Sequence, residues 1–362
     1  MSKQASAETL NPALRPAALL EARATRWAVI AFVISLVILP MLFGAERRPV
    51  AGSHSLGSLA AWSSMVFAGV GFGTSYYLES RYNPQQWRLR LPLVKRIADL
   101  LILCAASMML SHLMIVAISY LFQMGFVGLT VDRLGGAVLA SVATAATTYI
   151  STQGGAKVNS QSIAQLAVST VFAGTMASMI TAPDQAWWEW HFSALGNSDS
   201  RSGAQFNLTL AVTGLTLTAL STYIAHDLQR GMKLRGVENQ RLITALSWMF
   251  AGMGLCMMGV GLVTDAQNTA VHVSFATGMV LLYVVFMSCI ARFLPQAPLD
   301  LLIFAAVVVV AVVIAALLWI PIGYYNLTGM EFVAASFLFS WLIVFSRTAA
   351  AYGHDEHRYT GL

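Results

Sequence analysis

The chain has 362 residues, of which 57% are hydrophobic and only 10% are charged, and its mean hydropathy is +0.68. These values exclude a soluble domain and indicate a protein embedded in a membrane. The net charge of +5 does not indicate binding of nucleic acid, because the basic residues concentrate in the segments 79–96 and 226–241, between apolar runs. Such segments are expected beside anionic membrane lipid.

Ten apolar runs predict the fold. A helix needs roughly 20 apolar residues to cross a hydrocarbon layer of about 30 Å, and the backbone of a spanning segment must form its hydrogen bonds internally. We therefore expect an all-α, polytopic membrane helix bundle with about ten transmembrane helices. In chain order the predicted spans are residues 27–44, 56–78, 97–122, 134–152, 163–180, 205–225, 242–263, 270–293, 301–321 and 331–350.

The distribution of Lys and Arg predicts the orientation of these spans, since cytoplasmic segments hold an excess of positive charge. With the amino terminus in the cytoplasm, 17 of the 21 Lys and Arg residues fall in inner segments. The outer loops hold the other four, which are Arg47, Arg48, Arg133 and Arg201. We expect both termini in the cytoplasm. We expect no cleaved signal, because residues 1–26 contain no short apolar core with a cleavage site.

The predicted organisation is a four-span block followed by a six-span core. Its parts are a cytoplasmic segment at 1–26, the four-span block at 27–152, an inner linker at 153–162, the six-span core at 163–350 and a cytoplasmic tail at 351–362. The linker reads QGGAKVNSQS, and its glycines and polar residues predict a flexible connection. Within the block, Gly136, Ala140, Thr144 and Thr148 share one helical face and predict close packing against another helix.

One outer loop is much longer than its neighbours. It runs from Thr181 to Ala204, about 24 residues, and contains the stretch AWWEWHFSALGNSDS. Long ordered loops are often functional. Its three Trp residues are typical of anchors in the headgroup layer. Anchoring does not need the polar residues between and after them, so we treat these as ligand contacts: Glu189, His191, Ser193, Asn197 and Asp199.

Two shorter polar clusters are predicted on the same outer side. The first follows span seven and contains Asp265, Gln267, Asn268 and His272; the second precedes span ten and contains Tyr324, Tyr325, Asn326 and Glu331. Ionisable residues at or just within a membrane are costly and often functional. We expect a site for a membrane lipid or a lipid-like ligand, formed by Glu189, His191, Ser193, Asn197, Asp265, His272 and Glu331.

Catalysis is an alternative that the sequence leaves open. Ser193, His272 and Asp265 have the side chains of a nucleophile, a base and an orienting acid, the minimum for acyl transfer to or from a lipid. The chain has no G-x-S-x-G turn around Ser193. A metal hydrolase built from His191, His272, Asp265 and Glu331 would lack the H-E-x-x-H spacing. Neither a metal nor a cofactor is predicted.

Transport is the other alternative. His112 is the one ionisable residue near the centre of a predicted span, whereas carriers usually hold several charges or broken helices at that depth. The chain has no phosphate-binding G-x-x-x-x-G-K-[ST] loop, so it cannot use ATP by that route. A passive permease, or a subunit that assembles with another membrane protein, remains open. The sequence predicts no oligomeric state.

The stretch HFSALGNSDSRSGAQFNLTLAVTGLTLTAL, residues 191–220, resembles the signature of a six-span bacterial membrane family, domain of unknown function 998. The similarity extends over residues 160–350 and includes a Ser-x-x-Gly element at Ser193 to Gly196, Asn207, His272 and the final segment GYYNLTGMEFVAASFLFSWLIVFS. That family is similar to the eukaryotic Frag/DRAM/Sfk group, which is linked to lipid remodelling, lipid distribution and autophagy. The resemblance implies a multi-pass protein of the bacterial cell (inner) membrane, and it implies no established activity.

Overall fold

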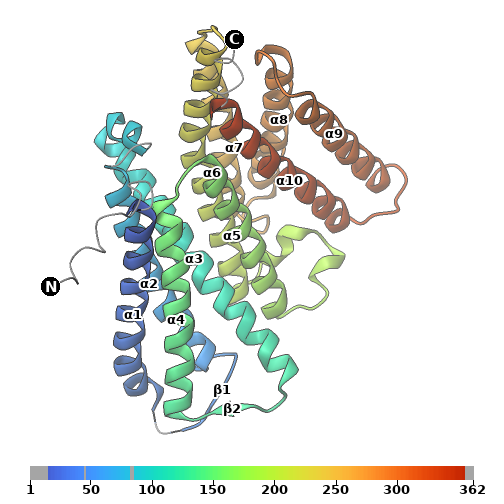
Figure 1. The fold of residues 1–362 in the computed structure, drawn as a ribbon. Coiled ribbons are helices and arrows are strands. Elements are labelled where there is room, and N and C mark those ends of the chain that lie inside the picture. Colours follow the sequence, from blue (N-terminus) through green and yellow to red (C-terminus); the bar gives the residue numbers. More distant parts are fainter. Residues whose placement is uncertain (1–14, 45, 82–84, 355–362) are drawn as a thin grey trace, which may run out of the picture. The chain divides into compact units, whose positions relative to one another are not determined.

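The computed structural model describes residues 15–44, 46–81 and 85–354 (Figure 1). Parts of the predicted terminal segments 1–26 and 351–362 therefore lie outside the described residues. The described chain forms ten long helices: α1 (Arg15–Phe43), α2 (Leu56–Glu79), α3 (Leu93–Gly125), α4 (Arg133–Ala156), α5 (Ser160–Thr181), α6 (Arg201–Leu234), α7 (Gln240–Leu262), α8 (Thr269–Phe293), α9 (Leu299–Trp319) and α10 (Leu327–His354).

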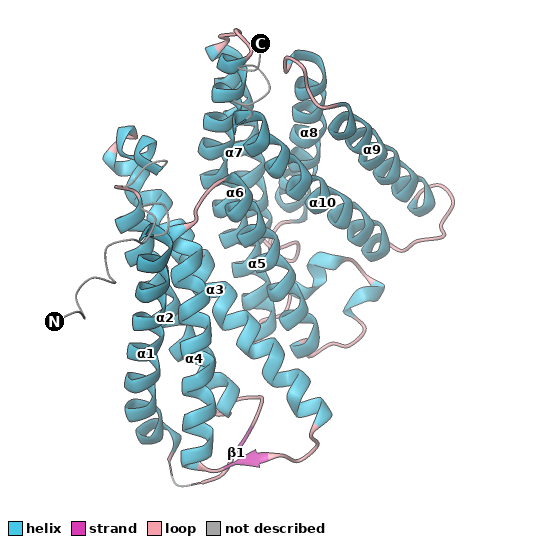
Figure 2. Ribbon diagram, viewed as in Figure 1, coloured by secondary structure: helices cyan, strands magenta, loops and turns pink. Residues whose placement is uncertain are grey.

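All ten helices are long and apolar enough to cross a membrane. The prediction of an all-α polytopic membrane protein is therefore confirmed (Figure 2). The only strands among the described residues are β1 (Arg48–Pro49) and β2 (Thr130–Val131), which pair in antiparallel fashion. Several helices exceed their predicted spans; α6 has 34 residues, which corresponds to about 50 Å at 1.5 Å per residue. Its ends must therefore extend beyond a hydrocarbon layer of about 30 Å.

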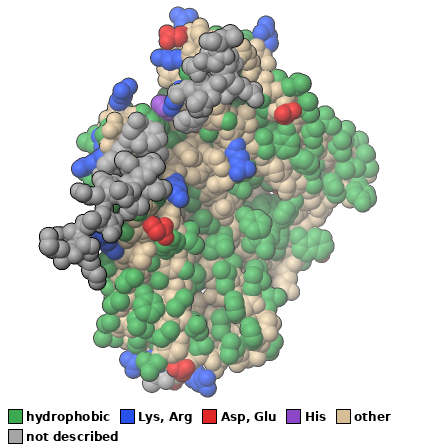
Figure 3. All heavy atoms as spheres, in the orientation of Figure 1, with side chains coloured by type: hydrophobic (Ala, Val, Ile, Leu, Met, Phe, Trp, Pro, Cys, Tyr) green, Lys and Arg blue, Asp and Glu red, His purple; other side chains and the backbone are tan. Residues whose placement is uncertain are grey.

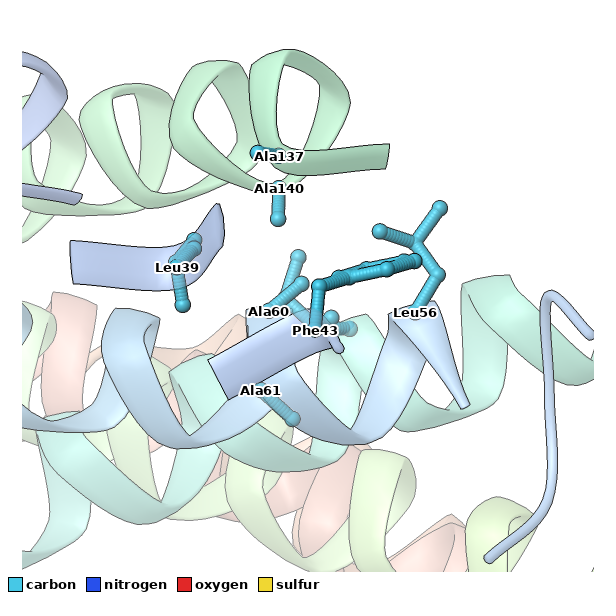
Figure 4. Packing of buried hydrophobic residues seen from close by; sticks show 8 residues of the cluster. Leu39, Phe43, Leu56, Ala60, Ala61, Ala137 and Ala140 are labelled. Atoms are coloured by element: carbon cyan, nitrogen blue, oxygen red, sulfur yellow. The ribbon is translucent and has the colours of Figure 1, made fainter. Parts of the chain in front are cut away.

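The chain divides into two compact units, Met1–Lys157 and Val158–Leu362. In the first unit α2 packs against α3 and α4, and α1 packs against α4. Figure 4 shows part of its core, in which the Phe43 side chain lies beside Leu56 and Ala60. The predicted packing face of α4 is confirmed: a Cβ on Gly136 would lie 2.5 Å from the Phe43 ring, and Thr144 is fully buried.

The stretch 153–162, expected to be a flexible connection, is mostly helical. Helix α4 continues to Ala156 and α5 begins at Ser160. A Cβ on Gly155 would lie 2.2 Å from the Phe72 carbonyl oxygen, so this glycine allows α4 to approach α2 closely. Asn159 begins α5 with a capping box, in which its side chain accepts a hydrogen bond from the Ser162 N–H. Such a cap stabilises the first turn of a helix.

A buried charge cluster that the sequence analysis did not identify lies between α2 and α3. Arg88, on the short 3-10 helix η1 (Gln85–Arg90), is only 2% exposed, and its guanidinium lies 4.4 Å from the centre of the Tyr76 ring. Asp99 is fully buried, pairs with Lys95 at 2.7 Å and is attracted by Arg88. Lys95 compensates the charge of Asp99, whereas the buried Arg88 guanidinium lies over the Tyr76 ring of α2 and makes no hydrogen bond within the described residues.

The second unit is built around α6, which packs against α5, α7 and α10, while α8 contacts α7 and α9 contacts α10. Helices α6 and α7 cross closely, because a Cβ on Gly214 would lie 2.4 Å from the Gly254 carbonyl oxygen. On the face drawn in Figure 3, hydrophobic side chains cover much of the surface, and charged side chains are sparse across it. Large exposed side chains such as Trp248, 71% exposed, are expected against lipid.

Candidate functional site

Three loops meet at one end of the second unit. The first, residues 182–200, joins α5 to α6; the second, 263–268, joins α7 to α8; the third, 320–326, joins α9 to α10. The Ala266 N–H donates to Asn197 Oδ1 at 3.1 Å and links the first two loops. Asn326 Nδ2 donates to the Trp188 carbonyl oxygen at 2.7 Å and links the first and third. We call these three loops the loop cluster, and residues 182–200 the long loop.

Two 3-10 helices give the long loop its shape, η2 (Trp187–Glu189) and η3 (Phe192–Gly196). The Phe192 ring packs edge-to-face against Phe206 on α6, with ring centres 5.4 Å apart, and against Phe332 on α10, at 4.8 Å. Its backbone N–H donates to Glu331 Oε2 at 2.5 Å. Phe192 therefore fixes the start of η3 to two helices through its side chain and its backbone.

The other end of η3 is held at Gly196. The Gly196 carbonyl oxygen accepts a hydrogen bond from Asn207 Nδ2 at 2.9 Å. A Cβ at this position would lie 2.2 Å from Asn207 Oδ1, a distance that no real Cβ tolerates. The Ser-x-x-Gly element thus has a physical basis, since only a glycine lets η3 approach α6 this closely. Ser193 lies between the two fixed ends.

Ser193 and His272 are hydrogen-bonded to each other. His272 lies in the first turn of α8 and is only 6% exposed. Its Nε2 lies 3.0 Å from Ser193 Oγ, and its Nδ1 lies 2.7 Å from the Val263 carbonyl oxygen. Because a carbonyl oxygen can only accept, Nδ1 carries the proton of the neutral ring. Nε2 is then free to accept the Ser193 hydroxyl proton.

The acid that the sequence analysis assigned to His272 has a different partner. Asp265 Oδ2 lies 3.4 Å from His191 Nε2, and both side chains are 23% exposed. The position that an orienting acid would occupy at His272 Nδ1 is taken by the Val263 carbonyl. Glu331 interacts electrostatically with His191, His272 and Asp265. Four ionisable side chains from two loops and two helices therefore share one region around Ser193.

A groove of about 410 Å³ opens on the long loop. Among the residues that line it are Asp184, Trp187, Trp190, His191, Asn197 and Ser198. Trp190 is 70% exposed beside it. The described residues that line this groove include a carboxylate and no Lys or Arg. The groove therefore combines aromatic faces with an acidic side chain.

The predicted site residues are not all brought together. Ser193, His272, His191, Asp265, Glu331 and Asn197 lie within one network of contacts. Glu189 is exposed on η2, and its side chain joins no hydrogen bond or ion pair of this network in the described chain. His112 belongs to the first unit, where its ring lies 5.0 Å from that of Trp62.

Sequence reasoning missed two participants. Phe192 carries a signal that could have been used, because a large aromatic side chain directly before Ser193 in the long loop favours a buried contact. Val263 carries none, since every residue has a carbonyl. Among the described residues, no three His, Cys, Asp or Glu side chains are placed to hold a metal ion.

Comparison with known proteins gives one match. A family model with the description "Protein of unknown function (DUF998)" matches residues 165–348. The matched segment covers the long loop and all residues of the network described above. No curated protein and no solved structure matches the chain.

Proposed function

The chain belongs to the DUF998 family of proteins of unknown function, and from its loop cluster we propose that it binds a membrane lipid, or a lipid-like amphiphile, by the headgroup. The groove on the long loop would hold the headgroup, and the apolar surfaces of the neighbouring helices would accept the acyl chains. The observation that carries this proposal is the groove itself, which joins tryptophan rings to polar side chains at the ends of membrane-spanning helices.

The tryptophans support a position at the headgroup layer. Trp188 is 52% exposed and Trp190 is 70% exposed, although both side chains are large and apolar. Trp is enriched at membrane interfaces, where its ring lies among headgroups and its N–H reaches water. A groove between such residues is within reach of a lipid headgroup in the surrounding leaflet.

The charge of the loop favours a headgroup that carries an amine. The long loop contains Asp184, Glu189 and Asp199 and no Lys or Arg. An ammonium group is attracted both by a carboxylate and by the face of a Trp ring within about 6 Å. Asp184, Trp187 and Trp190 all line the groove. Phosphatidylethanolamine has such a headgroup, whereas phosphatidylglycerol has only a negative charge and hydroxyls.

We propose further that the groove faces the extracytoplasmic side of a bacterial cell membrane, and the distribution of basic residues supports this orientation. The opposite end of the second unit holds the connection between α6 and α7, where Lys233 and Arg235 lie. An excess of positive charge is typical of cytoplasmic loops. The loop cluster, at the other end of the same helices, then faces outward.

The test is lipid selection by the purified protein. The full chain is placed in nanodiscs with equal amounts of phosphatidylethanolamine and phosphatidylglycerol, and retained lipid is measured by native mass spectrometry. We expect enrichment of phosphatidylethanolamine, reduced about two- to five-fold by Asp184→Asn, because an exposed ion pair contributes up to about 1 kcal/mol.

The matched control is Asp300→Asn, an exposed acid in the first turn of α9, far from the loop cluster at the other end of the unit. Its lipid pattern is expected to equal that of the wild type. Equal retention of both lipids by the wild type, or the same pattern in Asp184→Asn, contradicts the proposal.

A further inference from the structure

We infer that Ser193 and His272 form a nucleophile and general-base pair that transfers an acyl group from an ester-linked amphiphile. The identity of the amphiphile as a lipid rests on the proposed function; the reactivity of the pair does not. The inference starts from two hydrogen bonds that end on the same imidazole ring.

The first requirement is a base within reach of a hydroxyl. Ser193 Oγ and His272 Nε2 are 3.0 Å apart, within the range of about 2.6–3.2 Å that marks an activated nucleophile. The second requirement is a group that orients the base. The Val263 carbonyl oxygen, 2.7 Å from Nδ1, selects the tautomer whose Nε2 has a free lone pair.

Both partners are held rigidly. His272 lies in the first turn of α8, where Asn268 caps the helix by accepting from the Val271 N–H at 3.1 Å, and the ring is almost fully buried. Ser193 lies on η3, whose two ends are fixed by the bonds at Phe192 and Gly196. Reactive groups on restrained segments lose little freedom on reaching the transition state.

The reaction balances without any further cofactor. Ser193 Oγ attacks the ester carbonyl carbon while its proton moves to His272 Nε2. The bond between that carbon and the alcohol oxygen then breaks, and the alcohol leaves with the proton from Nε2. Water or the hydroxyl of a second lipid then gives its proton to Nε2 and attacks the acyl carbon. The bond between that carbon and Ser193 Oγ breaks, Oγ takes the proton back from Nε2, and a carboxylic acid or a new ester leaves.

Ser193 and His272 do not line the groove themselves, but residues on both sides of Ser193 do. His191 and Ala194 line the groove, and they flank Ser193 at a distance of two residues and one residue along the chain. A headgroup in the groove therefore lies beside the segment that carries the nucleophile. In a glycerophospholipid the carboxylic esters that join the acyl chains to glycerol lie a few bonds from such a headgroup, beyond the phosphodiester.

If the hydrogen bond between Ser193 and His272 only holds the long loop against α8, Ser193 is expected to be unreactive. The experiment therefore measures the chemical reactivity of Ser193 in the full-length protein in nanodiscs. A fluorophosphonate probe labels activated serines: a bond forms between Oγ and phosphorus, fluoride leaves, and the base takes the hydroxyl proton. We expect labelling of Ser193, located by mass spectrometry of peptides, and no labelling at that peptide in Ser193→Ala.

His272→Asn removes the base and is expected to slow labelling at least about 100-fold, the usual contribution of a general base. His272→Gln is the second variant, in case Asn weakens folding; elution on size exclusion shows which variants remain folded. The matched control is Ser274→Ala, two positions after His272 on α8, whose exposed hydroxyl bonds the Ala270 carbonyl at 2.7 Å. Its labelling rate is expected to equal the wild-type rate.

The inference is overturned if wild-type Ser193 is not labelled, or if folded His272 variants label at the wild-type rate. Lipid retention in the same samples separates the two proposals. If phosphatidylethanolamine is retained but Ser193 is not labelled, the lipid-binding proposal is supported and the proposal of a catalytic pair is contradicted. Labelling without selective retention supports the reactive pair and removes the lipid headgroup as its ligand.

Discussion

Glu331 accepts a hydrogen bond from the backbone N–H of Phe192 across 139 residues of sequence, at 2.5 Å. This bond joins the first turns of α10 to the long loop. Removing the acceptor leaves a partly buried N–H without a partner, which costs about 1–3 kcal/mol. We therefore predict that Glu331→Ala lowers the melting temperature and makes the long loop more sensitive to protease, whereas Glu331→Gln, which keeps an acceptor oxygen, does so less. Equal protease sensitivity of both variants and the wild type would contradict this role.

Gly196→Ala tests the glycine of the Ser-x-x-Gly element. The added Cβ meets Asn207 Oδ1 at 2.2 Å, so either the Asn207 side chain gives up its hydrogen bond to the Gly196 carbonyl or η3 moves away from α6. We expect a loss of about 1–3 kcal/mol, as for other overpacked sites. The double variant Gly196→Ala with Asn207→Ala regains the space and is expected to recover part of it in thermal unfolding.

The control for this prediction is Gly278→Ala on α8, where a Cβ meets only Cys256 Sγ at 3.6 Å. An alanine in the middle of a helix is favoured over glycine by up to about 1 kcal/mol, so this variant is expected to be neutral or more stable. A similar loss in both alanine variants would show that the Asn207 contact is not the cause.

The fold was predictable from the sequence to a large extent, because a lipid environment restricts the backbone to few solutions. Runs of apolar residues gave the number and class of the helices, and Gly136 marked a real packing face. The ends of α6 were not predictable from hydropathy, since its terminal turns continue beyond the apolar run as a polar helix. Gly155 was also misinterpreted: a glycine in a polar stretch indicated a loop, whereas in the structure its lack of a Cβ allows close packing of α4 against α2.

The sequence predicted which types of residue form the site, but it did not predict which side chains contact one another. Ser193 and His272 are 79 positions apart, and no local pattern states that they touch. Asp265 was the nearest acid in sequence to His272, yet its position in the turn directs it to His191. The Val263 carbonyl that orients His272 has no sequence signal at all. Side-chain chemistry can be read from one sequence, but partners set by loop geometry cannot.

The buried charges of the first unit give a prediction about stability. Asp99→Asn removes the charge of a fully buried carboxylate that pairs with Lys95 and attracts Arg88, which is 2% exposed. Leaving a buried charge without its partner costs about 3–5 kcal/mol. We expect a large drop in the thermal stability of this unit. The double variant Asp99→Asn with Arg88→Met removes both buried charges, and we expect it to recover part of the loss; no recovery would argue against coupling between Asp99 and Arg88.

Asp132 gives a prediction about pH. It caps α4, and hydrogen bonds from the backbone N–H groups of Gly135 and Leu134 lower the pKa of its carboxyl group below the usual value. A carboxyl with a lower pKa in the folded state contributes stability above its unfolded pKa, and loses it as the pH falls through the folded pKa. The protection of the amides in the first turn of α4, taken as the intrinsic exchange rate at each pH divided by the observed rate, should therefore fall in acid in the wild type. In Asp132→Asn, whose cap does not ionise, the same amides should show no such loss of protection.

Sidedness decides whether the groove can meet the lipid proposed for it. The cationic end of α6 and the long loop lie at opposite ends of one helix, so they must face opposite compartments if the unit spans the membrane. In a variant without Cys104, Cys256 and Cys289, we expect Trp190→Cys to react with an impermeant maleimide in intact cells. Val237→Cys, at a residue 37% exposed near the cationic end, is expected to react only after the cells are opened. Both positions belong to the same compact unit, so a movement between units cannot make them react equally. Equal reaction of the two cysteines in intact cells would contradict a position of the loop cluster at the outer leaflet.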